Sequence, residues 1–158
     1  MGTINLARVD DRLIHGQVMQ KWTKGKGTNS VYVVDNATAA DDFMKDIYVS
    51  TNSTGGLDIE VYSAKEVADQ WKKDQFGDAK VVIVFKYVKE VKEALDAGLE
   101  LKALNVGGIS KKPNTEQIIP GVNISEDEKG LLKEIHDSGI DVFFQQVPES
   151  KKVEYNLG

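Results

Sequence analysis

Two arginines, two aspartates and a histidine lie within one short stretch near the start of the chain: Arg8, Asp10, Asp11, Arg12 and His15. A neutral imidazole has a free lone pair near pH 7, so His15 can act as a nucleophile. Arg8 and Arg12 can offer two planar guanidinium groups, which match the oxygens of a phosphoryl group. The stretch therefore predicts phosphoryl transfer through His15.

The other residues of this stretch can assist the same chemistry. Asp10 and Asp11 would repel a phosphoryl group, so we expect them to orient the arginines or to accept the remaining imidazole proton. The sequence leaves open which aspartate does which. Gly16 would let the backbone approach the group, and a helix opening near Gln17 would offer free amides and the positive end of its dipole. We expect neither a metal nor a cofactor.

The run Leu6–Val18, with Trp22 and Thr23 in register, resembles the phosphorylation loop of IIB components of the mannose/fructose/sorbose family of bacterial sugar phosphotransferase systems. The segment Asn105–Gly108 extends the resemblance more weakly. The resemblance implies a protein-Nπ-phosphohistidine–sugar phosphotransferase that carries the phosphoryl group on Nδ1 of His15. We expect Arg8, Asp10, Arg12 and Gly16 to contact the phosphoryl group or a partner.

The resemblance also implies the partners. A IIA phosphocarrier domain would deliver the phosphoryl group from its own histidine, and the membrane IIC and IID components would hold the sugar that receives it. N-acetylgalactosamine, mannose, fructose and sorbose stay open as sugars, and so does a homo-oligomer. A net charge of −5 argues against nucleic acid as a partner.

The location follows from composition. The chain has no cysteine, which fits a reducing compartment, and no apolar run approaches the roughly 20 residues of a spanning helix. We therefore expect a cytoplasmic protein that associates with the membrane peripherally, through partner subunits.

The elements that must position the loop alternate between apolar strands and helical stretches. Strands are predicted over residues 4–7, 31–34, 59–62, 81–85, 103–106, 117–119 and 140–144. Helices are predicted over residues 39–48 and 88–97, and after caps at Ser63 and Ser125. This alternation predicts an α/β fold: one domain over residues 1–158, with an open, mainly parallel twisted sheet of about six to seven strands and helices on both faces.

Two further expectations concern the sheet and the tail. The uninterrupted apolar run Val81–Phe85 predicts a central strand, covered on both faces. The polar tail from Pro148 is expected to be loosely held.

Ligands of such sheets gather beyond the carboxyl ends of the strands. Asp35, Lys86 and the pair Gly107–Gly108 follow predicted strands, so we expect them to flank the His15 loop in one composite site. The glycines would either admit a close approach or simply end a strand. Arg8 and Arg12 are expected to be exposed, because unpaired buried guanidinium groups are costly.

A receiver-like regulatory phosphorylation module is the alternative, because receivers also carry an acidic pair after the first strand, here Asp10–Asp11. A receiver needs an aspartate at the end of its third strand, where this chain has Val61-Tyr62-Ser63. The second histidine, His136, has no convergent polar groups around it in sequence, and we expect it to serve only the end of a helix.

Overall fold

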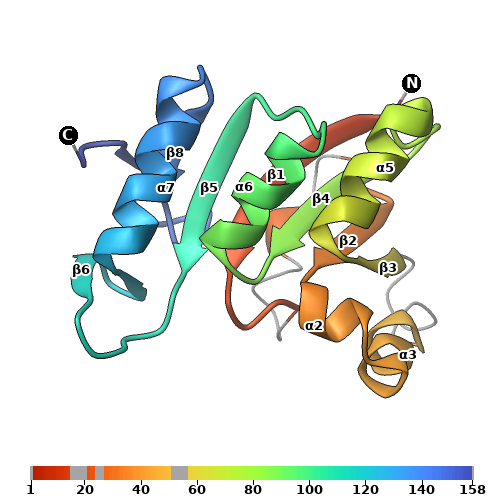
Figure 1. The fold of residues 1–158 in the computed structure, drawn as a ribbon, viewed down its shortest axis with the longest axis horizontal. Coiled ribbons are helices and arrows are strands. Elements are labelled where there is room, and N and C mark those ends of the chain that lie inside the picture. The colour runs from red at the N-terminus through yellow and green to blue at the C-terminus, as the bar shows by residue number, and fades with distance from the viewer. Residues whose placement is uncertain (1, 15–20, 24–26, 51–56, 158) are drawn as a thin grey trace.

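The computed structural model describes residues 2–14, 21–23, 27–50 and 57–157, and its centre is a seven-stranded sheet (Figure 1). In spatial order the strands are β3 (Asp58–Tyr62), β2 (Ser30–Val34), β4 (Lys80–Phe85), β1 (Thr3–Asp10), β5 (Ala103–Gly108), β8 (Asp141–Phe144) and β9 (Val153–Glu154). All neighbours run parallel except β8 and β9. The predicted open, mainly parallel sheet is confirmed.

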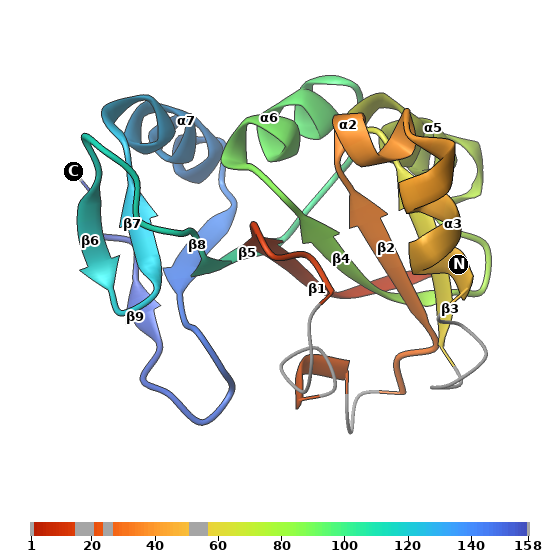
Figure 2. The same ribbon diagram turned by 90° about the horizontal axis from the view of Figure 1, so that it is seen from below.

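Helices cover both faces of this sheet, as predicted. One face carries α5 (Ala64–Asp74), α6 (Val88–Asp96) and α7 (Glu126–Asp137), which lie side by side (Figure 2). The chain between β2 and β3 forms α2 (Asn36–Ala39) and α3 (Asp42–Ser50). Tyr48 and Val49 of α3 pack against the opposite face. None of the helices described is long and apolar enough to cross a membrane.

The core explains why β4 and β1 lie inside the sheet. All five residues of Val81–Phe85 have no exposed surface, and they alternate between the two hydrophobic clusters on the two faces. Each fully buried side chain of this size contributes roughly 1.5–3 kcal/mol. The prediction that this run is an inner strand is confirmed. β1 is the next strand in the sheet and has three strands on each side, so the loop after it starts at a central position.

Local hydrogen bonds correct the predicted helix over residues 39–48. Asp35 caps α2 by accepting a bond from the backbone N–H of Thr38, so the helical segment begins earlier. The Asp41 carboxylate then accepts a bond from the backbone N–H of Met44, which starts α3 as a separate helix. Both helices begin where an aspartate side chain satisfies a free amide. The capping box of Ser63 and Glu66 is present as predicted.

The predicted strand over residues 117–119 exists but lies outside the main sheet. It is β6 (Glu116–Ile119), which pairs antiparallel with β7 (Val122–Ile124) around Pro120 and Gly121. Gly121 has a φ of +83°, a conformation that favours glycine. The turn at Pro120 and Gly121 therefore joins β6 and β7 into a hairpin.

The expectation of a loosely held tail is wrong. β9 extends the main sheet through β8, and Tyr155 stacks on His136 with ring centroids 4.0 Å apart. Val153 and Tyr155 also pack against the main hydrophobic cluster. Apolar residues within a polar stretch therefore hold this segment, and His136 lies in the last turn of α7, where it was expected.

Candidate functional site

The chain leaves β1 through a tight turn at the carboxyl edge of the sheet. The backbone N–H of Asp11 donates to the carbonyl of Gly108, and that of Leu13 donates to the carbonyl of Asp10, both at 2.9 Å. Leu13 has a φ of +57°, and its side chain is buried in the hydrophobic cluster that contains Val82 and Val84. Burial of this side chain offsets the strain of the left-handed backbone, which is of order 1 kcal/mol. The turn is therefore fixed, and it presents Arg12 to solvent.

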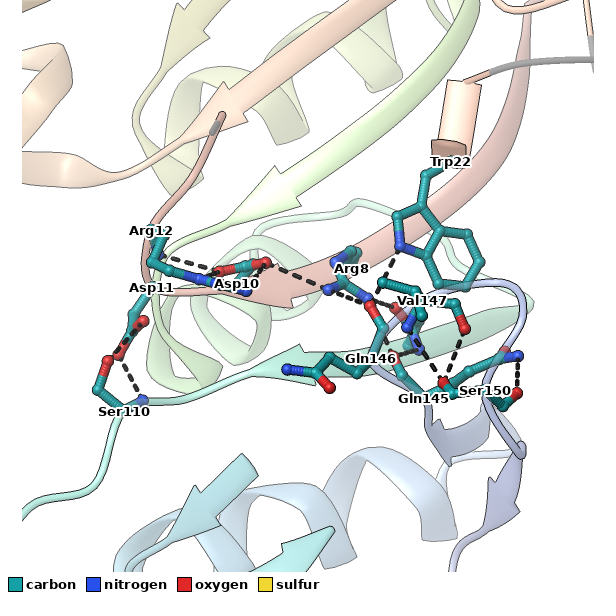
Figure 3. A network of polar contacts seen from close by, with 11 residues as sticks. Arg8, Asp10, Asp11, Arg12, Trp22, Ser110, Gln145, Gln146, Val147 and Ser150 are labelled. Atoms are coloured by element: carbon teal, nitrogen blue, oxygen red, sulfur yellow. Dashed lines mark hydrogen bonds and ion pairs between the residues drawn. The ribbon is translucent and has the colours of Figure 1, made fainter. Parts of the chain in front are cut away.

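Arg8 is fully buried, so the expectation that it is exposed is wrong. Figure 3 shows its guanidinium within a network of polar contacts that includes Asp10, Gln145 and Gln146. Its Nη1 donates to Oδ1 of Asn105 at 2.5 Å and to the carbonyl of Gln145 at 3.0 Å. Its Nη2 donates to Oδ2 of Asp10 at 3.2 Å and to the carbonyl of Gln146 at 2.8 Å. The expectation assumed an unpaired guanidinium, whereas four acceptors engage Nη1 and Nη2 of this one. Burial lowers the pKa of Arg8, while the Asp10 carboxylate raises it.

Arg12 is exposed, as predicted, with 45 % of its side-chain surface accessible. Asp10 accepts bonds from the backbone N–H of Arg12 at 3.0 Å, from its Nε at 3.2 Å and from its Nη2 at 3.3 Å. Asp10 itself is buried, so one carboxylate joins the buried arginine to the exposed one. Arg8 and Arg12 are positive and Asp10 is negative, so these three side chains, the arginine cluster, carry a net charge of +1. Arg12 is the exposed cation of the three.

Asp11 contacts a different segment from Asp10, while acceptance of the imidazole proton, the other role considered for the two aspartates, involves His15 and stays a prediction. Its Oδ2 accepts a bond from the backbone N–H of Ser110 at 2.8 Å, and its Oδ1 accepts one from the Ser110 hydroxyl at 3.1 Å. Lys112 lies 3.6 Å from the same carboxylate. Asp10 therefore orients the arginines, and Asp11 fastens the turn after β1 to the segment after β5.

Gly107 and Gly108 are the last two residues of β5, so the strand runs two residues further than predicted and ends with these glycines. A Cβ on Gly107 would overlap the guanidinium of Arg8, and one on Gly108 would lie 2.6 Å from Oδ1 of Asp10. Both glycines leave room for side chains of β1. The close approach that was expected for a ligand is therefore made by the protein's own arginine and aspartate.

His15 and Gly16 lie outside the described residues, so their predicted roles stay predictions. The same holds for the expected distance of Asp35 and Gly107–Gly108 from the His15 ring.

Asp35 is occupied as a helix cap. Its carboxylate accepts bonds from the backbone N–H of Thr38 at 3.1 Å and from its hydroxyl at 2.5 Å. Next to it, Glu90 is 4 % exposed and accepts a bond from the backbone N–H of Asn36 at 2.6 Å. Burial and the neighbouring Asp35 carboxylate raise the pKa of Glu90 to about 8. Burial alone would raise the pKa of Asp35, but hydrogen bonds from Thr38 and Glu90 outweigh this effect, so the pKa of Asp35 is lowered.

Several residues that contact the arginine cluster were not predicted. Asn105, Gln145 and Gln146 hold Arg8, and the Trp22 ring lies 5.1 Å from its guanidinium carbon, with the indole N–H 3.4 Å from the Gln146 carbonyl. Backbone carbonyls leave no trace in a sequence. The one signal was Asn105, an amide inside an otherwise apolar strand.

These contacts define a class of protein. An exposed guanidinium is held rigidly by a buried carboxylate at the carboxyl edge of a parallel sheet, which is where α/β domains bind anions. Among residues 2–14, 21–23, 27–50 and 57–157, no three metal-binding side chains gather into a site. The arrangement is that of an α/β domain with an exposed, oriented arginine at the sheet edge where such domains bind their ligands.

The comparisons with known proteins name the family. The PTS system sorbose subfamily IIB component family matches residues 4–157, and the chain belongs to it. The N-acetylgalactosamine-specific phosphotransferase enzyme IIB component 1 of Escherichia coli (strain K12) is 30 % identical over 149 residues, which are 94 % of each chain.

Solved structures agree with this assignment. The crystal structure of manxB from Thermoanaerobacter tengcongensis is 37 % identical and gives a TM-score of 0.87, and the match covers 98 % of this chain and 93 % of that chain.

A longer relative contains the same domain. The mannose-specific EIIAB component of Escherichia coli (strain K12) is 27 % identical over 95 % of this chain, and the match covers 46 % of that protein. The first of the two functions considered from the sequence is therefore the one that the family supports.

Proposed function

We propose that this IIB component accepts a phosphoryl group on His15 from a IIA domain and passes it to a sugar during uptake. The bond from phosphorus to the donor histidine of IIA breaks as a bond to Nδ1 of His15 forms. In the second step that bond breaks as the sugar hydroxyl attacks, and the hydroxyl proton leaves with solvent. Transfer between two histidines is nearly isoenergetic, so the protein must mainly position the group and stabilise its charge.

The observation that carries this proposal is the exposed fork of Arg12, which Asp10 holds within the turn after β1, three residues before His15 in the sequence. Arg12 retains donors for a partner's phosphoryl group, because Asp10 engages only Nε and Nη2. The buried Arg8 supplies the second positive charge, so the site stays cationic although Asp10 neutralises one arginine. Arg8 thus acts through Asp10 and not as a direct phosphate ligand.

Names among the relatives support the partners. One relative is named a mannose-specific EIIAB component, and this chain matches about half of its length. The letters A and B in that name support a IIA domain as the partner. Relatives named for sorbose, fructose, mannose and N-acetylgalactosamine share the domain. We therefore propose that sugar choice lies in membrane IIC and IID components, that residues 1–158 act as one cytoplasmic domain, and that they reach the membrane through these partners.

Label transfer tests the proposal. A IIA domain carrying radioactive phosphate is mixed with the wild type, with His15→Ala and with His136→Ala. We expect label on the wild type and on the His136 variant but not on the His15 variant. The label should be lost in acid and should form without Mg²⁺, because it is a phosphohistidine. Full labelling of His15→Ala would refute the assignment, and a requirement for Mg²⁺ would favour an aspartyl phosphate of the receiver kind.

A further inference from the structure

Asn105 is a polar residue in the middle of a buried strand. It lies opposite Arg8 in the register between β1 and β5, and it has no exposed surface. Its neighbours Leu104 and Val106 belong to the main hydrophobic cluster. Burying an amide is unfavourable unless its hydrogen bonds are made, so this position requires a specific partner.

The contacts of Asn105 fix the plane of the Arg8 guanidinium. Its Oδ1 accepts from Nη1 of Arg8 at 2.5 Å, and its Nδ2 donates to the carbonyl of Gln145 at 3.0 Å. The same carbonyl accepts from Nη1 of Arg8 at 3.0 Å, which closes a triangle of hydrogen bonds. With Nη1 held on this side, Nη2 faces Asp10 and the carbonyl of Gln146.

The orientation passes from Arg8 to the surface. Oδ2 of Asp10 accepts from Nη2 of Arg8 at 3.2 Å and from Nη2 of Arg12 at 3.3 Å, while its Oδ1 accepts from Nε of Arg12. We propose that Asn105 is a positioning residue of the phosphoryl-transfer site, acting through Arg8 and Asp10 on the exposed guanidinium of Arg12. The inference rests on the proposed function for its chemistry and on these contacts for its geometry.

Charge explains why a neutral amide suits this position. Arg8, Asp10 and Arg12 together carry a net charge of +1. A carboxylate in place of the amide would reduce this charge to zero at a buried site, where charges are poorly screened. It would also compete with Asp10 for Arg8 and so release the carboxylate that orients Arg12. An asparagine accepts the bond from Arg8 without either effect.

Two substitutions separate geometry from charge. Asn105→Leu keeps the branching at Cγ but removes both hydrogen bonds, and Asn105→Asp keeps the acceptor oxygen but adds a negative charge. The matched controls are Asn123→Leu and Asn123→Asp, because Asn123 is also buried but donates to the carbonyl of Ile109.

The first measurement does not depend on activity. The Nε–H resonance of Arg12 is followed by NMR in the full, unphosphorylated chain and assigned by its disappearance in Arg12→Lys. We expect both Asn105 variants to displace this resonance, and both Asn123 variants to leave it in place. The second measurement is label uptake from phosphorylated IIA per folded molecule. We expect Asn105→Asp to lower kcat by about tenfold while KM for IIA changes by less than about threefold.

The outcomes are distinct. An Arg12 resonance that is unmoved in Asn105→Asp, together with transfer within about twofold of the wild type, would overturn the proposal. If Asn105→Leu does not fold, Asn105→Asp decides alone, because it retains the bond to Arg8. A wild type that takes no label from IIA, with the Arg12 resonance still displaced in the Asn105 variants, would refute the proposed function while supporting the coupling.

Discussion

Glu90→Gln should make the protein more stable in alkaline solution. Glu90 is buried beside Asp35, and one of its oxygens accepts a bond from the backbone N–H of Asn36. Glutamine has nearly the same shape and keeps an acceptor for that bond. It also stays neutral at every pH, so the substitution removes only the need to ionise a buried acid next to another carboxylate.

The magnitude follows from linkage between protonation and folding. Burial and Asp35 raise the pKa of Glu90 from 4.5 to about 8, so the folded state binds this proton more tightly than the unfolded state. The resulting stability is complete below about pH 4.5 and is lost as the pH rises to about 8. The loss corresponds to about 3–5 kcal/mol. The pKa of Asp35 is lowered, so its contribution is lost only in acid, outside this range.

Urea unfolding of the wild type and Glu90→Gln between about pH 5 and pH 9 measures the difference directly. We expect similar stability near pH 5 and an advantage of about 3–5 kcal/mol for the variant near pH 9. Glu93→Gln is the control, because Glu93 lies on the same helix and is exposed, and accepts a bond from the Asn36 side chain. A difference between wild type and Glu90→Gln that does not change with pH would refute the reasoning.

Three further predictions concern the arginine cluster. Arg12→Lys should slow label transfer by about tenfold through loss of the planar fork, with a thermal midpoint close to that of the wild type, because the exposed ion pair contributes less than about 1 kcal/mol. Arg8→Met should lower the free energy of unfolding in urea by about 3–5 kcal/mol, since it removes the buried cation that pairs with the buried Asp10 carboxylate; a loss below about 1 kcal/mol would contradict the burial argument. Gly108→Ala should lower it by about 1–3 kcal/mol, because the new Cβ would lie 2.6 Å from Oδ1 of Asp10. Gly130→Ala, which meets no atom within 4 Å in α7, should instead be neutral or stabilising, and equal losses in the two alanine variants would rule out the steric explanation.

The fold was largely predictable because burial on both faces leaves a plain pattern. Val81–Phe85 could be placed inside the sheet from its uninterrupted apolar run, and all five residues are fully buried. The bounds of the helix predicted over residues 39–48 were wrong because Asp35 begins α2 earlier and Asp41 starts α3 as a separate helix, and each cap depends on where one carboxylate points. Periodicity does not contain that information.

The site was predictable in its residues and less so in its contacts. Arg8, Asp10 and Arg12 were predicted as a group, and the structure brings them together. The exposure of Arg8 was wrong because its partners Asn105 and Gln145 lie 97 and 137 residues further along the chain. Physical reasoning about one buried charge is sound only when all its acceptors are known, and a backbone carbonyl can come from any part of a chain.

The carbonyls that hold Arg8 also set the order in which the site can be completed during synthesis. Arg8 leaves the ribosome well before Gln146, which follows 138 residues later in the chain. A nascent chain that has β1 to β5 but ends before Gln145 already contains the loop, yet Arg8 lacks two of its four acceptors. The parallel sheet adds contacts between distant segments, which form slowly. The hydrogen bonds of the arginine cluster are therefore complete only when almost the whole domain has been synthesised. In a shorter nascent chain, Arg8 and Arg12 do not yet have the fixed positions of the folded protein.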